Sequence, residues 1–317
     1  QVAVAVNATL SMLYWQIGKR IKEEILQNKR AEYGKEIIAT LSTQLTEDFG
    51  SGWSKRQLHH CLRFAETFPE STIVHTLCTQ LSWSHYILLL GLNDGDKREY
   101  YIAETVKNNW SVRQMERQIN SQLFERLLLS NDKESVLAVA RNEKLPTNPS
   151  EIIKDPMVLE FLGLRRESAY YEKDLEQAII THLQDFLLEL GNGFSFVSRQ
   201  KRIHLEGDDF FIDLVFYNRL LQCFVLFEIK THKLTHEDLG QLQMYVNYYD
   251  RVEKVTHEKP TIGILLCADK NDAVVKYSLP ENNNSILASQ YQLYLPTEEQ
   301  LLKEIRREIE ILNKNDE

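Results

Sequence analysis

The segment from Phe210 to Lys230 places charged side chains where a buried sheet is expected. Two runs rich in Phe, Val, Ile, Leu and Tyr are joined by a short turn, which predicts two adjacent β-strands. The first run contains Asp213, and the second ends in Glu228-Ile229-Lys230. Alternate residues of a strand share a face, so Glu228 and Lys230 point the same way. Because buried charge needs an opposite charge or a metal ion, the hairpin is predicted to carry a functional site.

These residues belong to a wider pattern that resembles a known enzyme family. An acid on one strand and an acid-x-lysine on the next resemble the signature of the PD-(D/E)XK nucleases, where these groups converge on a divalent cation. From about Pro156 to Tyr294 the chain resembles the YhcG-like branch of that superfamily. The stretches that carry the resemblance are DP (155–156), LEFL (159–162), LEQAIITHLQDFLLELGNGFSFVSRQ (175–200), IDLVFYN (212–218), FEIK (227–230) and IGILLCADKND (262–272). The resemblance implies a C-terminal mixed α/β domain of the restriction-endonuclease-like fold that cuts DNA.

The resemblance also implies a metal site and the role of each residue in it. Mg²⁺, for which Mn²⁺ can substitute, would be held by Asp213, Glu228 and the main-chain carbonyl of Ile229, since hard cations prefer oxygen ligands. Lys230 would orient or deprotonate the attacking water and hold developing negative charge, helped by any lowering of its pKa near the metal. The alternative is a surface Glu-x-Lys ion pair beside an unrelated Asp at a strand end.

Three further catalytic candidates follow mainly from the resemblance. Glu176 matches an acid that many members place near the metal, although a solvated helix residue is the alternative. Gln241 and Tyr245 lie four residues apart on one helix face, and they match a Gln-x-x-x-Tyr pattern of RecB-like members. They are expected to bind the substrate phosphate.

Polar and basic residues on the preceding strand suggest contacts with nucleic acid. Arg199, Gln200 and Arg202 lie just upstream of the acidic strand and would line a DNA channel, since fixed basic groups attract the phosphate backbone. Ordinary charges at a strand edge are the alternative. His232 and His236 invite a zinc interpretation, but no third nitrogen or sulfur ligand is evident, so zinc is not expected.

The first 130 residues are predicted to be wholly helical. A helix over 35–49 is stopped by glycines at 50 and 52, and another begins after Ser54, a favourable N-cap, and ends before Pro69. This layout is that of a helix-turn-helix, or of an ordinary αα-hairpin with a solvated face. The residues expected to reach DNA from its second helix are Lys55, Arg56 and Arg63.

Two stretches further along the helical region resemble ParB-type DNA-binding proteins. They are LSWSHYILLLGL (81–92) and NNWSVRQMERQI (108–119), and the second adds Arg113 as a candidate DNA contact. The motif is short, because a serine such as Ser111 caps helices of every kind.

The predicted organisation is α+β overall, with an all-helical N-terminal domain and a C-terminal nuclease domain. The boundaries are 1–130 for the helical domain, 131–150 for a polar linker interrupted by prolines, and 151–317 for the nuclease domain. In the latter we expect one helix ending at Gly191 after periodicity over 168–190. The other expected elements are strands over 194–204, 210–217, 221–230 and 261–267, a helix over 235–249 and a C-terminal packing or dimer helix over 297–312.

Composition bounds the cellular setting more than the function. Among 317 residues the four cysteines are scattered without C-x-x-C spacing, which favours a reducing cytoplasm. No run of about 18 apolar residues predicts a membrane span. A net charge of −9 argues against broad nonspecific DNA binding, yet basic surface can be confined to one face.

The sequence therefore predicts a cytoplasmic, bacterial, Mg²⁺-dependent endonuclease that acts as a homodimer. Its expected partner is DNA, with branched or foreign DNA as candidate substrates, and no membrane is expected. Two alternatives stay open at this point. The chain can be a catalytically silent DNA-binding or assembly module of a larger complex, or a nuclease directed at RNA, since the same metal chemistry attacks either backbone.

Overall fold

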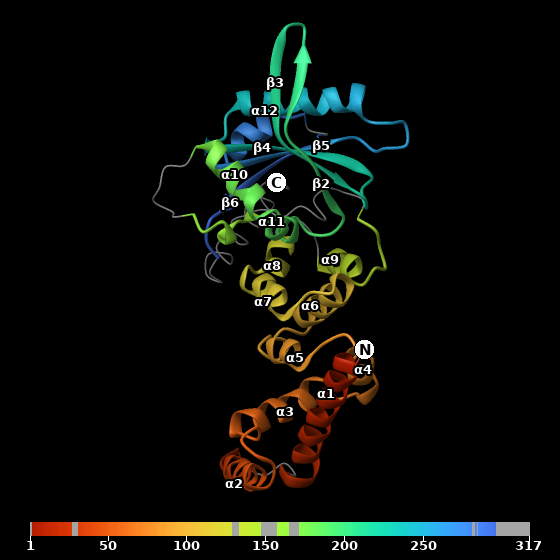
Figure 1. Cartoon of the computed structure of the whole chain (residues 1–317), viewed down its shortest axis with the longest axis vertical. Coiled ribbons are helices and arrows are strands. Elements are labelled where there is room, and N and C mark those ends of the chain that lie inside the picture. Colours follow the sequence, from red (N-terminus) through yellow and green to blue (C-terminus); the bar gives the residue numbers. More distant parts are fainter. Residues whose placement is uncertain are drawn as a thin grey trace, which may run out of the picture. The chain divides into compact units, whose positions relative to one another are not determined.

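The computed structural model describes residues 2–26, 31–128, 133–146, 157–164, 171–280, 283 and 285–295. The chain forms two compact units, residues 1–117 and 118–317, called here the helical unit and the sheet unit (Figure 1). No helix within these described ranges is long and apolar enough to cross a membrane. Each unit is described by itself.

In the part of the helical unit that the structure describes, the regular elements are all helices, as predicted. They are α1 (Val2–Arg20) with a π-helical turn (Ile21–Leu26), α2 (Ala31–Phe49), α3 (Lys55–Thr67), α4 (Ser71–Leu77), α5 (Trp83–Leu90), α6 (Gly95–Asn108) and the start of α7 (Val112–Asn120). Helix α3 begins where predicted, because the Ser54 hydroxyl accepts a hydrogen bond from Gln57 N at 3.3 Å. Helices α1 and α3 approach closely at Gly18, where a Cβ would lie 1.8 Å from the carbonyl oxygen of Cys61.

The sheet unit is built on six strands in the order β1-β6-β5-β4-β3-β2. Their bounds are β1 Met157–Val158, β2 Phe194–Leu205, β3 Asp208–Asn218, β4 Cys223–Lys233, β5 Ile262–Asp269 and β6 Ile286–Gln292. Pairing is antiparallel between β2, β3 and β4, and parallel from β4 to β5, β6 and β1. This is a mixed sheet, and together with the helical unit it confirms the predicted α+β class.

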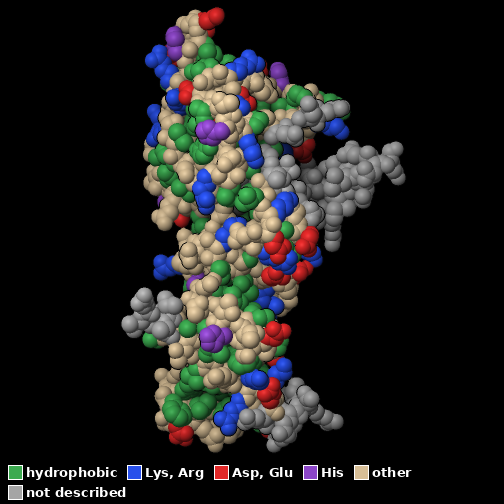
Figure 2. Space-filling view, turned by 90° about the vertical axis from the view of Figure 1, so that its right-hand side faces the viewer, with side chains coloured by type: hydrophobic (Ala, Val, Ile, Leu, Met, Phe, Trp, Pro, Cys, Tyr) green, Lys and Arg blue, Asp and Glu red, His purple; other side chains and the backbone are tan. Residues whose placement is uncertain are grey.

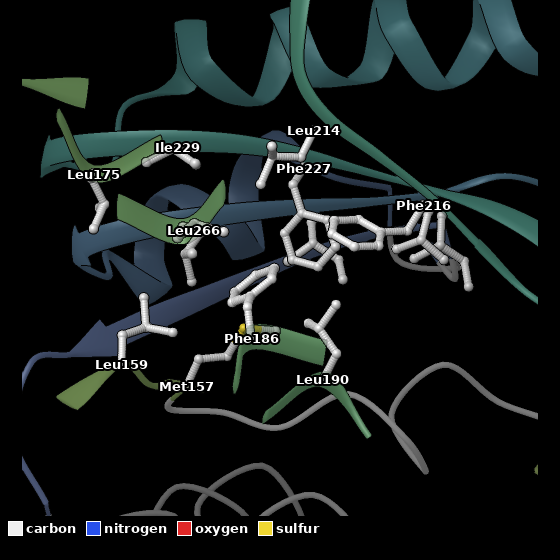
Figure 3. Packing of buried hydrophobic residues seen from close by; sticks show 14 of the residues in the cluster. Met157, Leu159, Leu175, Phe186, Leu190, Leu214, Phe216, Phe227, Ile229 and Leu266 are labelled. Atoms are coloured by element: carbon white, nitrogen blue, oxygen red, sulfur yellow. The ribbon is translucent and has the colours of Figure 1, made fainter. Parts of the chain in front are cut away.

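Helices cover both faces of this sheet (Figure 1). One face packs against α10 (Glu172–Thr181) and α11 (Leu183–Leu190). Aromatic rings meet in this core, where the ring centroid of Phe186 lies 5.9 Å from that of Phe216 and 5.8 Å from that of Phe227 (Figure 3). The opposite face packs against α12 (His236–Tyr248), with Leu242 and Tyr245 fully buried. A short helix, α13 (Asp272–Ser278), lies beside α12. These two cores hold the central strands rigidly.

Two expectations about helices need correction. The periodic segment that was expected to form one helix up to Gly191 is divided, because His182 leaves the helical conformation with φ −108° and ψ 34° between α10 and α11. Residues 133–140 of the expected linker form a helix, α9, which packs against α8 (Leu123–Leu128). The buried residues of α9 are Val136, Leu137 and Ala140. This short apolar stripe lies between polar residues, and for that reason the whole segment was predicted to be a linker.

Other differences concern elements at the edge of the prediction. Strands β1 and β6 were not expected, although the other strands and α12 appear within a few residues of their predicted bounds. The sheet unit begins at Gln118, so α8 and α9 belong with it by their contacts. The predicted C-terminal helix over 297–312 lies outside the described residues.

Candidate active site

The site lies where β3 and β4 stop pairing. The ladder between the two strands ends at Leu214 and Phe227, and beyond this point β3 pairs only with β2. Asp213 is the first residue past the ladder, and its Oδ2 accepts a hydrogen bond from the main-chain N–H of Ile229 at 2.8 Å. The Asp213 carboxylate therefore takes the place of the next main-chain acceptor in the ladder and faces Ile229 of β4.

The three residues of the predicted signature come together at this point. Glu228 is 2% exposed and Lys230 is 9% exposed, while Asp213 is half-buried. Lys230 Nζ lies 3.5 Å from Glu228 Oε2. Their neighbour Ile229 points into the core, where it joins the same hydrophobic cluster as Leu175 of α10. The core thus fixes the strand that carries the charged pair.

The electrostatics of the two acids fit a missing positive charge. Burial, reinforced by the nearby Asp213 carboxylate, raises the pKa of Glu228 to about 8. Burial also raises the pKa of Asp213, despite the hydrogen bond from Ile229. Glu228 Oε1 is buried and has no hydrogen-bond partner among the described residues. An orphaned oxygen beside a second carboxylate suits a divalent cation, since such ions bind through oxygen.

This donor set is small. In the described part of the chain no group of three or more His, Cys, Asp or Glu side chains is placed to hold a metal ion. Two carboxylates, with main-chain oxygen and water completing the shell, are what Mg²⁺ accepts, because it keeps several of its waters. The residues present therefore fit Mg²⁺ better than zinc, which favours nitrogen and sulfur ligands.

The surroundings of Lys230 raise its pKa in the metal-free protein, and the lowering expected beside a bound metal stays a prediction. Burial lowers its pKa, but the carboxylates of Glu228, Glu172 and Asp213 together outweigh burial and raise it. Glu172 Oε2 lies 3.5 Å from Lys230 Nζ. The ammonium group is therefore charged at neutral pH in the metal-free protein.

Glu176 lies next to the predicted site and is 3% exposed. Its Oε2 accepts a hydrogen bond from Gln200 Nε2 at 2.5 Å, and the same nitrogen donates to Asp213 Oδ1 at 2.9 Å. Arg199 Nε lies 2.5 Å from Glu176 Oε1 and its guanidinium also donates to Gln177 Oε1. Glu176 is thus not the solvated helix residue of the alternative interpretation. It is joined to Asp213 through Gln200.

Gln241 and Tyr245 lie on one face of α12, as predicted. Gln241 Nε2 donates to the Tyr245 hydroxyl at 2.7 Å, and that hydroxyl donates to the carbonyl oxygen of Phe211 at 3.2 Å. Tyr245 is fully buried. Its hydroxyl therefore faces strand β3 two residues before Asp213, so in this structure it supports the strand instead of being presented to a substrate.

The chain is similar to known proteins along almost its whole length. Residues 150–309 match the description YhcG PDDEXK nuclease domain, and residues 1–126 match the DUF1016 N-terminal domain. The chain is 37% identical to YhcG of Escherichia coli (strain K12), across 96% of this chain and 88% of that protein. It belongs to the YhcG family of PDDEXK nucleases.

A solved repair endonuclease from Pyrococcus abyssi is a much more distant match for this YhcG-family chain. It is 20% identical, with a TM-score of 0.27, and the match covers 41% of this chain and 50% of that chain.

Sequence reasoning missed the acidic residues that surround Lys230 in this member of the YhcG family. Glu172 occupies the first turn of α10, four residues before Glu176, so the two acids share a helix face. Asp238 is 8% exposed at the start of α12 and caps that helix through Thr235. His232 Nε2 lies 3.6 Å from Glu172 Oε1. The i, i+4 spacing from Glu176 was the available signal.

The predicted nucleic-acid contacts are distributed over both units of the YhcG-family chain. Arg202 is bound by Asp209 through two hydrogen bonds of 2.8 Å. In the helical unit Arg56 donates to His60 and Arg63 donates to Asn93, while Lys55 and Arg113 are exposed. Figure 2 shows Lys and Arg side chains scattered among hydrophobic and polar ones on the face in view. On this face the basic side chains do not gather into one patch, so each candidate phosphate contact is a separate prediction.

Proposed function

We propose that this YhcG-family chain is a metal-dependent endonuclease that hydrolyses phosphodiester bonds of DNA. The observation that supports it most is the pair of carboxylates, the half-buried Asp213 and the buried Glu228, which lie beside Lys230 where two strands diverge. Removing a carboxylate from water costs free energy, so such acids are seldom retained for stability alone. A site that binds a cation and a phosphate gives them a use.

Each residue has a distinct task in this proposal. Asp213, Glu228 and the carbonyl of Ile229 would hold Mg²⁺ or Mn²⁺. When bound, the cation neutralises charge on the phosphoryl oxygens and lowers the pKa of a water molecule. Lys230, kept protonated by its acidic neighbours, orients the attacking water and stabilises negative charge on the phosphate. Gln241 and Tyr245 keep β3 in place through the Phe211 carbonyl.

We expect Asp213→Ala to abolish cleavage that depends on Mg²⁺, because the variant loses one of two acidic ligands. Purified wild type and variant are compared on duplex DNA, branched DNA and single-stranded RNA, each with Mg²⁺ and with EDTA. Asp208→Ala, at an exposed position of the same strand, is the matched control and is expected to cut like wild type.

Three results would count against the proposal. Undiminished cutting by Asp213→Ala means that the activity comes from elsewhere. Cutting of RNA alone identifies an RNA-directed nuclease. Binding of DNA with no cutting of any substrate identifies a silent binding module.

For the helical unit we propose that α3 contacts the DNA backbone. Ser54 caps this helix, and Lys55, Arg56 and Arg63 are exposed on it. A Lys55→Ala, Arg56→Ala, Arg63→Ala variant is expected to weaken duplex binding in Ca²⁺ at least about tenfold. Each lost phosphate contact should also reduce the dependence of log Kd on log salt by about 0.9. The control is Lys19→Ala on α1, whose lysine pairs with Glu23. An unchanged salt dependence in the triple variant would rule out this role for α3.

A further inference from the structure

Gln200 has a backbone conformation that its residue type rarely adopts. Its φ is +46°, within strand β2, although glycine is the residue that tolerates this region best. The ladder between β2 and β3 contains the pairs Arg199–Leu214 and Lys201–Ile212, while the intervening pair of Gln200 with Asp213 is absent. Strain of this kind is retained where the surrounding structure requires it, often at functional sites.

The strained backbone directs the Gln200 side chain to two acids. Its Nε2 donates to Glu176 Oε2 at 2.5 Å and to Asp213 Oδ1 at 2.9 Å. The side-chain amide has two N–H groups, and both are used in this way. Glu176 is 3% exposed and is also paired with Arg199. A single side chain therefore connects helix α10 to the acid on β3.

Both carboxylate oxygens of Asp213 accept a hydrogen bond. Oδ2 accepts from Ile229 N and Oδ1 accepts from Gln200. Rotation of the carboxylate about its Cβ–Cγ bond would break both hydrogen bonds. Without Gln200, the hydrogen bond from Ile229 and the attraction of Lys230 would remain, and the nearby Glu176 carboxylate would repel the Asp213 carboxylate.

We propose that Gln200 is a positioning residue that sets the Asp213 carboxylate for a divalent cation by tying it to Glu176. This inference rests on the proposed nuclease function and assigns to Gln200 a role different from the DNA contact expected from sequence. Gln200 itself is exposed, so a DNA contact is the competing role. The two roles differ in what they change, since positioning affects metal affinity and turnover, while a DNA contact affects DNA affinity.

The test compares Gln200→Ala with a matched control, Gln222→Ala. Gln222 is also a glutamine with positive φ, +55°, but it lies in the exposed turn between β3 and β4. Three experiments are run on each protein: cleavage kinetics on duplex DNA with Mg²⁺, which give kcat and KM, titration calorimetry for the Kd of Mn²⁺, and binding of the same DNA in EDTA for its Kd. Gln200→Asn is the second variant, because asparagine tolerates the left-handed region but is too short to bridge both acids.

For both Gln200 variants we expect kcat and Mn²⁺ affinity to fall about tenfold or more, with DNA Kd within about twofold of wild type. Gln222→Ala should match wild type in all three. Unchanged Mn²⁺ affinity would overturn the inference, and so would unchanged kcat or a DNA Kd that rises in step with lost turnover. Those results leave the proposed nuclease function intact as long as Asp213→Ala is inactive. Cleavage that survives in Asp213→Ala removes the proposed function itself.

Discussion

Replacing Glu228 with glutamine is expected to abolish metal-dependent cleavage and, at the same time, to stabilise the metal-free protein at pH 8. Glutamine has nearly the same shape but no charge, so it cannot balance a cation. Loss of several kcal/mol of charge stabilisation corresponds to a loss of about 10³-fold in kcat. The expected gain in stability has a separate cause, which is the cost of the buried carboxylate.

The direction of the pH effect follows from the pKa of Glu228. Burial raises this pKa from 4.5 to about 8. Between these values the folded protein holds a proton that the unfolded chain has released, so stability falls as pH rises through this window. Glu228→Gln removes this loss, and at pH 8 we expect it to raise the free energy of unfolding by roughly 2–4 kcal/mol. The lost pairing with Lys230 offsets part of the gain.

The measurement is urea unfolding of both proteins in EDTA at pH 5 and pH 8, together with cleavage assays in Mg²⁺. The stability difference between the variant and wild type should be larger at pH 8 than at pH 5. Glu237→Gln, at an exposed position of α12, is the control and should change neither property. A Glu228→Gln variant that is less stable than wild type at pH 8 would contradict the raised pKa of Glu228 and the expected cost of its buried charge.

Replacing Arg126 with leucine is expected to destabilise the sheet unit strongly. Arg126 of α8 and Glu189 of α11 are both fully buried, with Arg126 NH1 at 2.5 Å from Glu189 Oε1. Arg126 Nε also donates to the carbonyl oxygen of Ser121 at 2.8 Å, and Glu189 Oε1 accepts from Val158 N at 3.0 Å. The pair thus connects two helices and strand β1.

Arg126→Leu removes the guanidinium that pairs with the buried Glu189 carboxylate, and breaking a buried pair from one side costs about 3–5 kcal/mol. The free energy of unfolding is measured for Arg126→Leu, Glu189→Leu and the double variant. We expect the double variant to lose less free energy of unfolding than the sum of the two single variants, because the two side chains interact directly. Arg141→Ala, which breaks exposed ion pairs with Glu134 and Glu143, should cost about 1 kcal/mol or less. Additive losses in the double variant would contradict a coupled buried pair.

Much of the fold could be predicted because it depends on local patterns. Runs rich in Phe, Val, Ile, Leu and Tyr identified β3 and β4, and Ser54 with the glycines before it identified the start of α3. Prediction failed where the decision was tertiary. The break at His182 leaves the apolar stripe of α10 and α11 unchanged, so no pattern in the sequence revealed it. Strand β6 has the mixed sequence ILASQYQ and is a strand because β5 pairs with it.

For the site, the sequence by itself determined that Asp213, Glu228 and Lys230 lie close together. They sit on consecutive strands joined by a short turn, and strand geometry leaves little choice in where they point. Only the tertiary structure decided what surrounds them. Burial lowers the pKa of Lys230, Glu228 on the same strand raises it most, and Glu172, which is brought in by helix packing, raises it further. The link from Glu176 through Gln200 to Asp213 needs a left-handed backbone that glutamine does not favour. Burial, charge and strain are properties of the assembled fold, so no local pattern could have predicted them.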